Sequence, residues 1–179
     1  IRREGEAQIA LIGAPHAGKS QLHSQLTGSK ADIGPYPFTT KLPQPGMMPF
    51  EDLYFQLVDM PPVSSDYIEG WIVNSLQPAD GVLLVVDLGD PGCAEHIQAI
   101  LRQLTERKID LHGWWPGLKG PKPVPEPTFD EDGEEILDDP FRISLPAILV
   151  GNKCDLVTDP AAELQVLTEL LELDFPTVA

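Results

Sequence analysis

Apolar stretches of strand length alternate along this chain with stretches of helical periodicity. Continuous apolar runs at residues 7–12, Gly81–Asp87 and 146–150 predict buried strands. Apolar residues at helical spacing predict helices at residues 19–26, 66–76, 93–107 and 160–173. The alternation predicts an α/β fold in which a mostly parallel central sheet is covered by helices on both faces.

Shorter signals refine this pattern between the main elements. Residues 46–50 and Leu53–Asp59 are strand-like runs around an acidic pair, which predicts a hairpin. Gly28 follows the first helical stretch and is a typical helix stop. The polar, proline-rich residues 29–45 predict a loop, and residues 176–179 predict the start of one more strand.

Residues 110–144 break the alternation. They contain Trp114 and Trp115, many prolines and the acidic run 130–139. Such a length exceeds an ordinary connection, so we expect a surface insertion within one domain that spans residues 1–179. The favoured interpretation is a family-specific decorated loop. The alternative is a partner-docking element that uses the tryptophans.

Composition narrows the classes of function. The chain has 179 residues and a formal net charge of −16, which disfavours direct binding to nucleic acid. No apolar run reaches the 18–20 residues or so that span a bilayer, so no membrane partner is expected. Cys93 and Cys154 give no disulfide framework, which favours the cytoplasm. Because the chain begins at Ile1, we expect it to be a piece of a longer protein.

Residues 13–20, Gly-Ala-Pro-His-Ala-Gly-Lys-Ser, match the phosphate-binding pattern G-x-x-x-x-G-K-[ST]. This phosphate loop lies between a predicted strand and a predicted helix, as the pattern requires. Backbone N–H groups and the helix N-terminus attract phosphate, while Lys19 reaches the β- and γ-phosphates and assists catalysis. The predicted phosphate contacts are Gly13, Pro15, His16, Ala17, Gly18, Lys19, Ser20 and Gln21.

Three oxygen-bearing residues are predicted to hold Mg²⁺. The Ser20 hydroxyl is the usual ligand from a phosphate loop. Asp59 ends a predicted strand, where a carboxylate can hold the ion directly or through water. Thr40, weakly preferred over Thr39, lies in the loop 29–45 and would complete the metal shell when the γ-phosphate is present.

A second motif, Asn-Lys-Cys-Asp at residues 152–155, follows a predicted buried strand; we call it the base loop. The Asp155 carboxylate can accept hydrogen bonds from two adjacent donors of guanine, a pair that adenine lacks. Lys153 can lay its aliphatic stem along the base, and Asn152 can tie the base loop to the phosphate loop. The predicted ligand is therefore GDP or GTP, and an adenine-nucleotide enzyme is disfavoured.

Together these residues resemble the Obg/DRG branch of the translation-factor-related GTPases. The resemblance rests on the phosphate loop, on Tyr-Pro-Phe-Thr-Thr at residues 36–40, on Asp59 at a strand end and on the base loop. It implies slow GTP hydrolysis with Mg²⁺, and action with a ribosome or protein partner through additional domains. It also implies a Ser-Ala motif after the last predicted strand. The sequence ends near that strand, so we expect a G domain truncated at its C-terminal end.

Two departures from the family pattern and one feature that fits it bear on mechanism. Pro62 stands where the family has a glycine whose N–H senses the γ-phosphate, and proline has no N–H. Val63 stands where Ras-like enzymes carry a glutamine that orients water; the resemblance implies an apolar residue there, so Val63 fits the branch. His16 replaces an asparagine that binds potassium in many relatives, which puts potassium stimulation in doubt. Two hypotheses follow: a slow GTPase that acts as a molecular switch, or a non-hydrolysing guanine-nucleotide-binding module used for assembly or stability.

Overall fold

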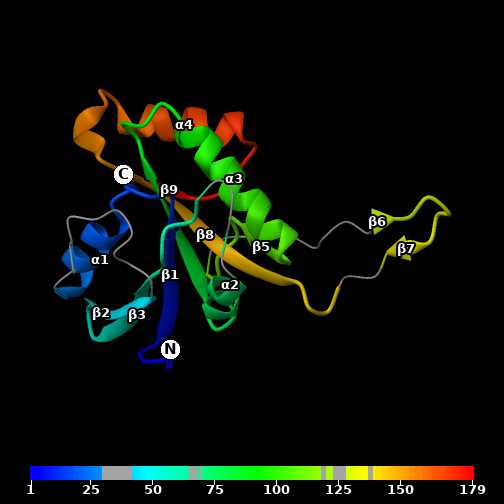
Figure 1. Cartoon of the computed structure of the whole chain (residues 1–179), viewed down its shortest axis with the longest axis horizontal. Coiled ribbons are helices and arrows are strands. Elements are labelled where there is room, and N and C mark those ends of the chain that lie inside the picture. Colours follow the sequence, from blue (N-terminus) through cyan, green and yellow to red (C-terminus); the bar gives the residue numbers. More distant parts are fainter. Residues whose placement is uncertain (30–41, 65–67, 69, 118–119, 123–127, 137–138) are drawn as a thin grey trace.

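The computed structural model describes residues 1–29, 42–64, 68, 70–117, 120–122, 128–136 and 139–179. Figure 1 shows a central sheet with helices beside it and a small hairpin that stands away from it. The helices are α1 (Lys19–Thr27), α2 (Gly70–Leu76), α3 (Cys93–Glu106) and α4 (Pro160–Leu170), with a 3-10 turn at Cys154–Leu156. The strands are β1 (Ala7–Gly13), β2 (Gln44–Phe50), β3 (Leu53–Asp59), β4 (Gly81–Asp87), β5 (Ile109–His112), β6 (Thr128–Phe129), β7 (Glu135–Ile136), β8 (Ile143–Asn152) and β9 (Thr177–Val178).

The main sheet has the strand order β2-β3-β1-β4-β8-β5, and β9 also pairs with β8. All pairs are parallel except the β2–β3 hairpin. Parallel order brings the carboxyl ends of β1, β3, β4 and β8 to one edge of the sheet, where ligands bind in folds of this kind. The predicted α/β fold with a mostly parallel sheet is confirmed.

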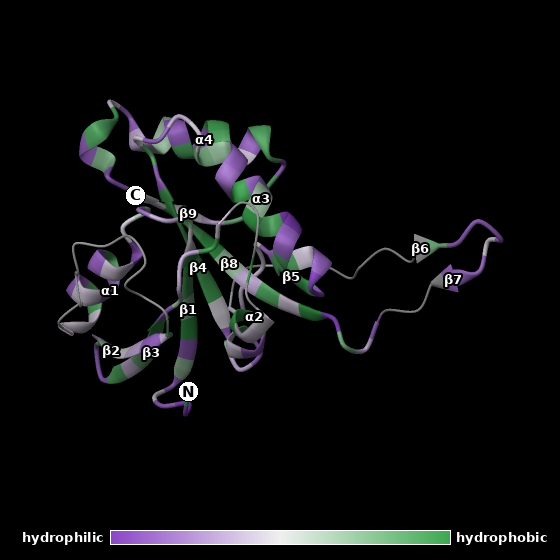
Figure 2. Ribbon diagram, viewed as in Figure 1, coloured by the Kyte–Doolittle hydropathy of each residue, from purple (hydrophilic) through white to green (hydrophobic). Residues whose placement is uncertain are grey.

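Side chains of β4 alternate between two layers, as the two-residue period of a strand requires. Val82, Leu84 and Val86 join the large core that also contains apolar residues of α2, α3 and α4. Leu83 and Val85 belong to a smaller cluster on the other side, with Leu22 of α1. In Figure 2 the central strands are coloured mostly hydrophobic, which agrees with burial on both faces. No helix in the described ranges is both long and apolar enough to cross a membrane.

Several expectations about the elements were wrong, including the end of α4, which lies at Leu170 and not at residue 173. The helix expected from residue 66 begins at Gly70, and Ile68 is buried in the core outside any helix. Strand β8 begins at Ile143, three residues before the expected start. Strand β5 was missed, since it is short, carries Asp110 among four residues and pairs with a strand far along the chain.

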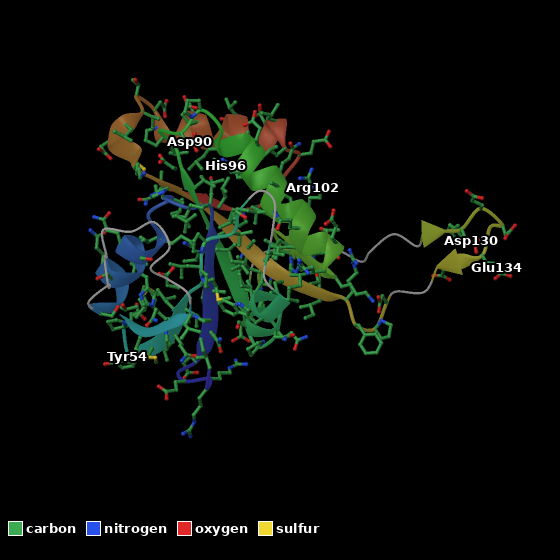
Figure 3. The ribbon with its side chains drawn as sticks, viewed as in Figure 1. Tyr54, Asp90, His96, Arg102, Asp130 and Glu134 are labelled. Atoms are coloured by element: carbon green, nitrogen blue, oxygen red, sulfur yellow. The ribbon has the colours of Figure 1, made fainter. Side chains whose placement is uncertain are left out.

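Residues 110–144 are therefore not all loop, since they include the end of β5 and the start of β8. Between these strands, the β6–β7 hairpin projects away from the sheet, and its turn carries Asp130 and Glu134 (Figures 1 and 3). Trp115 packs back onto the domain, where its Nε1 donates to the Ala147 carbonyl oxygen at 3.1 Å. Its ring lies against Gly81 so closely that an added Cβ there would be 2.4 Å from it. Trp115 thus anchors the residues that follow β5 to the main sheet. That residues 110–144 form a surface insertion stays a prediction.

Candidate functional site

The phosphate loop joins the end of β1 to the start of α1. His16 and Gly18 both have left-handed backbones, with φ of 65° and 88°, so the chain reverses sharply before the helix. Gly18 is the N-cap of α1, and no side chain caps that helix end. The first N–H groups of a helix have no partner within the helix, so this loop presents backbone donors to an anion.

Lys19 lies at the first turn of α1 with only 6% of its surface exposed. Burial lowers the pKa of its ammonium group, and the nearby Asp59 carboxylate opposes this by raising it. A buried cation with its pKa lowered in this way gains from a new anionic partner. A phosphate at the start of α1 would give this ammonium group such a partner.

Asp59, at the end of β3, meets Ser20 of α1. The Ser20 Oγ donates to Asp59 Oδ2 at 2.5 Å. Asp59 is 2% exposed, and its Oδ1 is buried without a hydrogen-bond partner in the described part of the chain. A buried carboxylate oxygen normally has a partner, so an unsatisfied one next to a hydroxyl fits a hard cation that prefers oxygen ligands. The two residues fit Mg²⁺.

The base loop is bonded directly to the phosphate loop. Asn152 Nδ2 donates to the Ala17 carbonyl oxygen at 2.9 Å. Gly18 permits this approach, since a Cβ there would lie 2.2 Å from Asn152 Nδ2. The structure thus brings together two motifs that are separated by more than a hundred residues in sequence.

Lys153 adds a second link between the loops. Its Nζ donates to the His16 carbonyl oxygen at 2.9 Å and to Asp87 Oδ2 at 2.6 Å. Asp87 ends β4, and its other oxygen accepts a hydrogen bond from the Gly89 N–H at 2.9 Å. Sequence reasoning missed Asp87, although a carboxylate that ends a buried strand on this edge of the sheet is a recognisable signal.

A cleft of about 470 Å³ lies between α1 and the base loop. Gln21, Leu22 and Gln25 line it from the helix. Asp155 lines it from the base loop, and its exposed side chain leaves its acceptor oxygens accessible to a ligand. Val178 and Ala179, which the sequence did not suggest, also line it because β9 pairs with β8.

A second cavity, of about 380 Å³, adjoins the other side of the phosphate loop. Pro15 and His16 line it together with residues of α3, including His96. His96 Nδ1 lies 3.1 Å from Asp90 Oδ2 near the start of that helix (Figure 3). The predicted ligand Thr40 and its neighbour Thr39 lie outside the described residues.

Comparison with known families gives a match over most of the fold described above. Residues 8–112 match the model of the family described as 50S ribosome-binding GTPase. The chain is 29% identical to an uncharacterized GTP-binding protein of Methanocaldococcus jannaschii over 158 residues, which are 80% of this chain and 40% of that protein. It is 30% identical to the GTPase Obg of Myxococcus xanthus over 167 residues, which are 92% of this chain and 30% of that protein.

A further relative supports this match, and two solved structures share the fold. A developmentally regulated G-protein of Arabidopsis thaliana is 34% identical over 92 residues, which cover 49% of this chain and 23% of that protein. A bacterial selenocysteine-specific elongation factor shares the fold with a TM-score of 0.56 at 18% identity, over 98% of this chain and 25% of that one. The G domain of the T. maritima FeoB iron transporter does so with 0.52 at 20%, over 96% of this chain and 85% of that one. The chain thus spans less than half the length of these curated relatives.

Proposed function

The chain belongs to the 50S ribosome-binding GTPase family, and from this premise we propose that its cleft binds GDP and GTP with Mg²⁺ and hydrolyses GTP slowly, as a molecular switch. The Obg- and DRG-like resemblance seen in the sequence is confirmed by relatives of both kinds. Guanine-nucleotide binding follows from the family. The individual contacts, the metal and the turnover are part of the proposal.

One observation carries the proposal, namely the hydrogen bond from Asn152 Nδ2 to the Ala17 carbonyl oxygen. It fixes the base loop beside the phosphate loop, so that one ligand can reach both. A nucleotide whose phosphates lie on the N–H groups at the start of α1 would extend its base towards Asp155. Guanine would give the Asp155 carboxylate two donors, whereas adenine would leave it without them.

Ser20 and Asp59 would hold Mg²⁺, and Thr40 would join them when the γ-phosphate is present. The buried, unpartnered Asp59 Oδ1 supports this assignment among the described residues. Mg²⁺ bound there would neutralise part of the negative charge on the phosphates. Lys19 would add a positive charge beside them, in a site where burial weakens competition from water.

We expect hydrolysis to be slow because Val63 and the loop 29–45 lack side chains that speed the reaction in other GTPases. Val63 is 1% exposed and apolar, so it cannot orient an attacking water. The loop 29–45 contains no arginine that could stabilise developing charge in cis. Lys19 and the loop N–H groups would stabilise that charge without positioning the nucleophile.

The runner-up function is a guanine-nucleotide-binding module without turnover, and the burial of Val63 favours it. A single-turnover assay with excess protein over GTP separates the two. Release of phosphate faster than from GTP in buffer supports a slow GTPase. A rate equal to that of buffer, for protein shown to bind GTP, supports the non-hydrolysing module.

The nucleotide that copurifies with the protein tests the proposal itself. Protein purified in Mg²⁺ is denatured, and the released nucleotide is identified by chromatography and mass. We expect GDP or GTP from the wild-type chain and much less from Asp155→Ala. An adenine nucleotide in the extract, retained equally by Asp155→Ala, would contradict the proposal.

We further propose a cytoplasmic protein whose ribosome or protein partner is engaged by additional domains of the kind that the resemblance implies. The net charge of −16 supports indirect rather than direct contact of this domain with RNA. Trp115 is committed to the Ala147 carbonyl, so it does not support docking by the tryptophans.

A further inference from the structure

The segment that follows Asp59 runs along the end of β1 towards the phosphate loop. The Met60 N–H donates to the Leu11 carbonyl oxygen at 3.1 Å, and the Val63 N–H donates to the Gly13 carbonyl oxygen at 3.0 Å. Val63 and Ser64 line the same cavity as Ala14 and Pro15 of the phosphate loop. A phosphate beyond the β-phosphate would therefore lie close to this segment.

No backbone donor of residues 60–63 is free to bind such a phosphate. The N–H groups of Met60 and Val63 are already bonded to carbonyl oxygens of β1. Pro61 and Pro62 have no N–H. In GTPase switches, contacts of this kind order the segment when the γ-phosphate is present.

The segment is also held in place by its side chains. Met60 is 0% exposed and Val63 is 1% exposed, and both belong to the main hydrophobic core. Gln103 of α3 donates from Nε2 to the Ser64 carbonyl oxygen at 2.7 Å. A movement that released the Val63 N–H for a ligand would expose apolar surface and break these bonds, both of which are unfavourable.

We propose that Pro62 is a specificity-determining residue that removes the γ-phosphate contact from residues 60–63, so that this segment adds nothing to the affinity for guanosine triphosphate over diphosphate. The inference rests on the proposed function and restricts it. Residues 60–64 do not report the γ-phosphate, because a ligand group without a differential contact cannot shift the segment. Any response to GTP then arises from other parts of the chain or from a partner.

Calorimetric titration with GDP and with a non-hydrolysable GTP analogue, both in Mg²⁺, tests this inference. The ratio of the two wild-type dissociation constants is the reference value. Pro62→Gly restores an N–H at residue 62 and should tighten binding of the analogue about tenfold with GDP unchanged. Pro61→Ala, which restores an N–H one residue earlier, is the matched control and should leave the ratio unchanged.

Pro62→Ala repeats the test with less backbone freedom if the glycine variant is unstable. A folded Pro62→Gly or Pro62→Ala protein with an unchanged ratio, or an equal shift in Pro61→Ala, would overturn the assignment to Pro62. If neither nucleotide bound wild-type protein, the proposed function itself would be wrong. If both nucleotides bound but the ratio did not change in the Pro62 variants, only the inference would be wrong.

Discussion

The side-chain amide of Asn152 donates to the carbonyl oxygen of Ala17 at 2.9 Å, and this bond sets the distance between the base loop and the phosphate loop. Both groups are polar and partly buried, so an unpaired carbonyl would be costly. The bond therefore organises the site before any ligand arrives.

Asn152→Ala should weaken GDP binding without unfolding the domain. Loss of the bond leaves the Ala17 carbonyl unsatisfied and frees the base loop, at a cost of about 1–3 kcal/mol, or about 5- to 150-fold in dissociation constant. Calorimetry measures the affinity, and Thr158→Ala, an exposed change just beyond the base loop, is the control. Wild-type affinity in Asn152→Ala would show that the link does not matter for binding.

Asp59→Asn should remove the advantage that Mg²⁺ gives to nucleotide binding. The variant keeps the shape of the side chain but loses the charge of the buried oxygen that lacks a partner among the described residues. We expect GDP to dissociate from the variant at similar rates with Mg²⁺ and with EDTA, whereas EDTA should speed release from wild-type protein at least about tenfold. Asp52→Asn, on the exposed turn before β3, should behave as wild type. A variant that still responds fully to Mg²⁺ would place the metal elsewhere.

Asp87→Asn should weaken GDP binding less than Asn152→Ala does. Asp87 Oδ2 holds Lys153 Nζ at 2.6 Å, but the lysine side chain is 36% exposed, so solvent screens the pair. We expect a loss of about three- to tenfold, or roughly 0.7–1.4 kcal/mol, that shrinks at high salt. Asp90→Asn is the control, because Asp90 is a nearby carboxylate whose neighbour is His96 and not Lys153. Equal effects of the two variants would indicate a general charge effect.

Lys19→Met should preserve or raise the stability of the nucleotide-free domain while it abolishes stabilisation by GDP. Burial lowers the pKa of Lys19 below its ordinary 10.5. Between the lowered pKa and 10.5 the unfolded chain binds more protons, so wild-type stability rises with pH in that window. The advantage of Lys19→Met should therefore be largest below the lowered pKa and shrink as the pH rises towards 10.5.

Thermal unfolding at several pH values, with and without GDP, measures both effects. At a GDP concentration about 100 times the dissociation constant, wild-type protein should gain about 2.7 kcal/mol and Lys19→Met far less. Lys122→Met, an exposed lysine change, should keep the full gain. A Lys19→Met protein that is less stable at neutral pH without nucleotide would contradict the burial argument.

The sequence predicts the central part of this fold well because burial on both faces leaves a strong pattern. The run Gly81–Asp87 coincides with β4, and Gly28 ends α1 with a left-handed backbone, as expected. Strand β5 has no such signal, since it is a short edge strand whose position depends on pairing with β8. Such pairing depends on a partner strand far away in the sequence, so the local periodicity of β5 does not predict it.

The residues of the site likewise divide into those that the sequence predicts and those that it does not. The phosphate and base loops are recognisable because each chemical task restricts residue type at fixed spacing. Asp87 was recognisable in the sequence as a carboxylate at the end of a buried strand. Val178 reaches the site only because β9 pairs with β8, which local patterns do not specify. The hydrogen bonds that commit the N–H groups of Met60 and Val63 likewise required the structure, although Pro62 was visible as a departure.

The most direct test of the central claim is a calorimetric comparison of GDP, inosine diphosphate and ADP on wild-type protein and on Asp155→Asn. Inosine lacks the exocyclic amine, so it removes one of the two donors proposed to meet the Asp155 carboxylate. We expect wild-type protein to bind GDP more tightly than inosine diphosphate, and at least about 100-fold more tightly than ADP. In Asp155→Asn most of these differences in affinity should disappear. Equal affinities for the three nucleotides on wild-type protein, or an unchanged order in the variant, would contradict it.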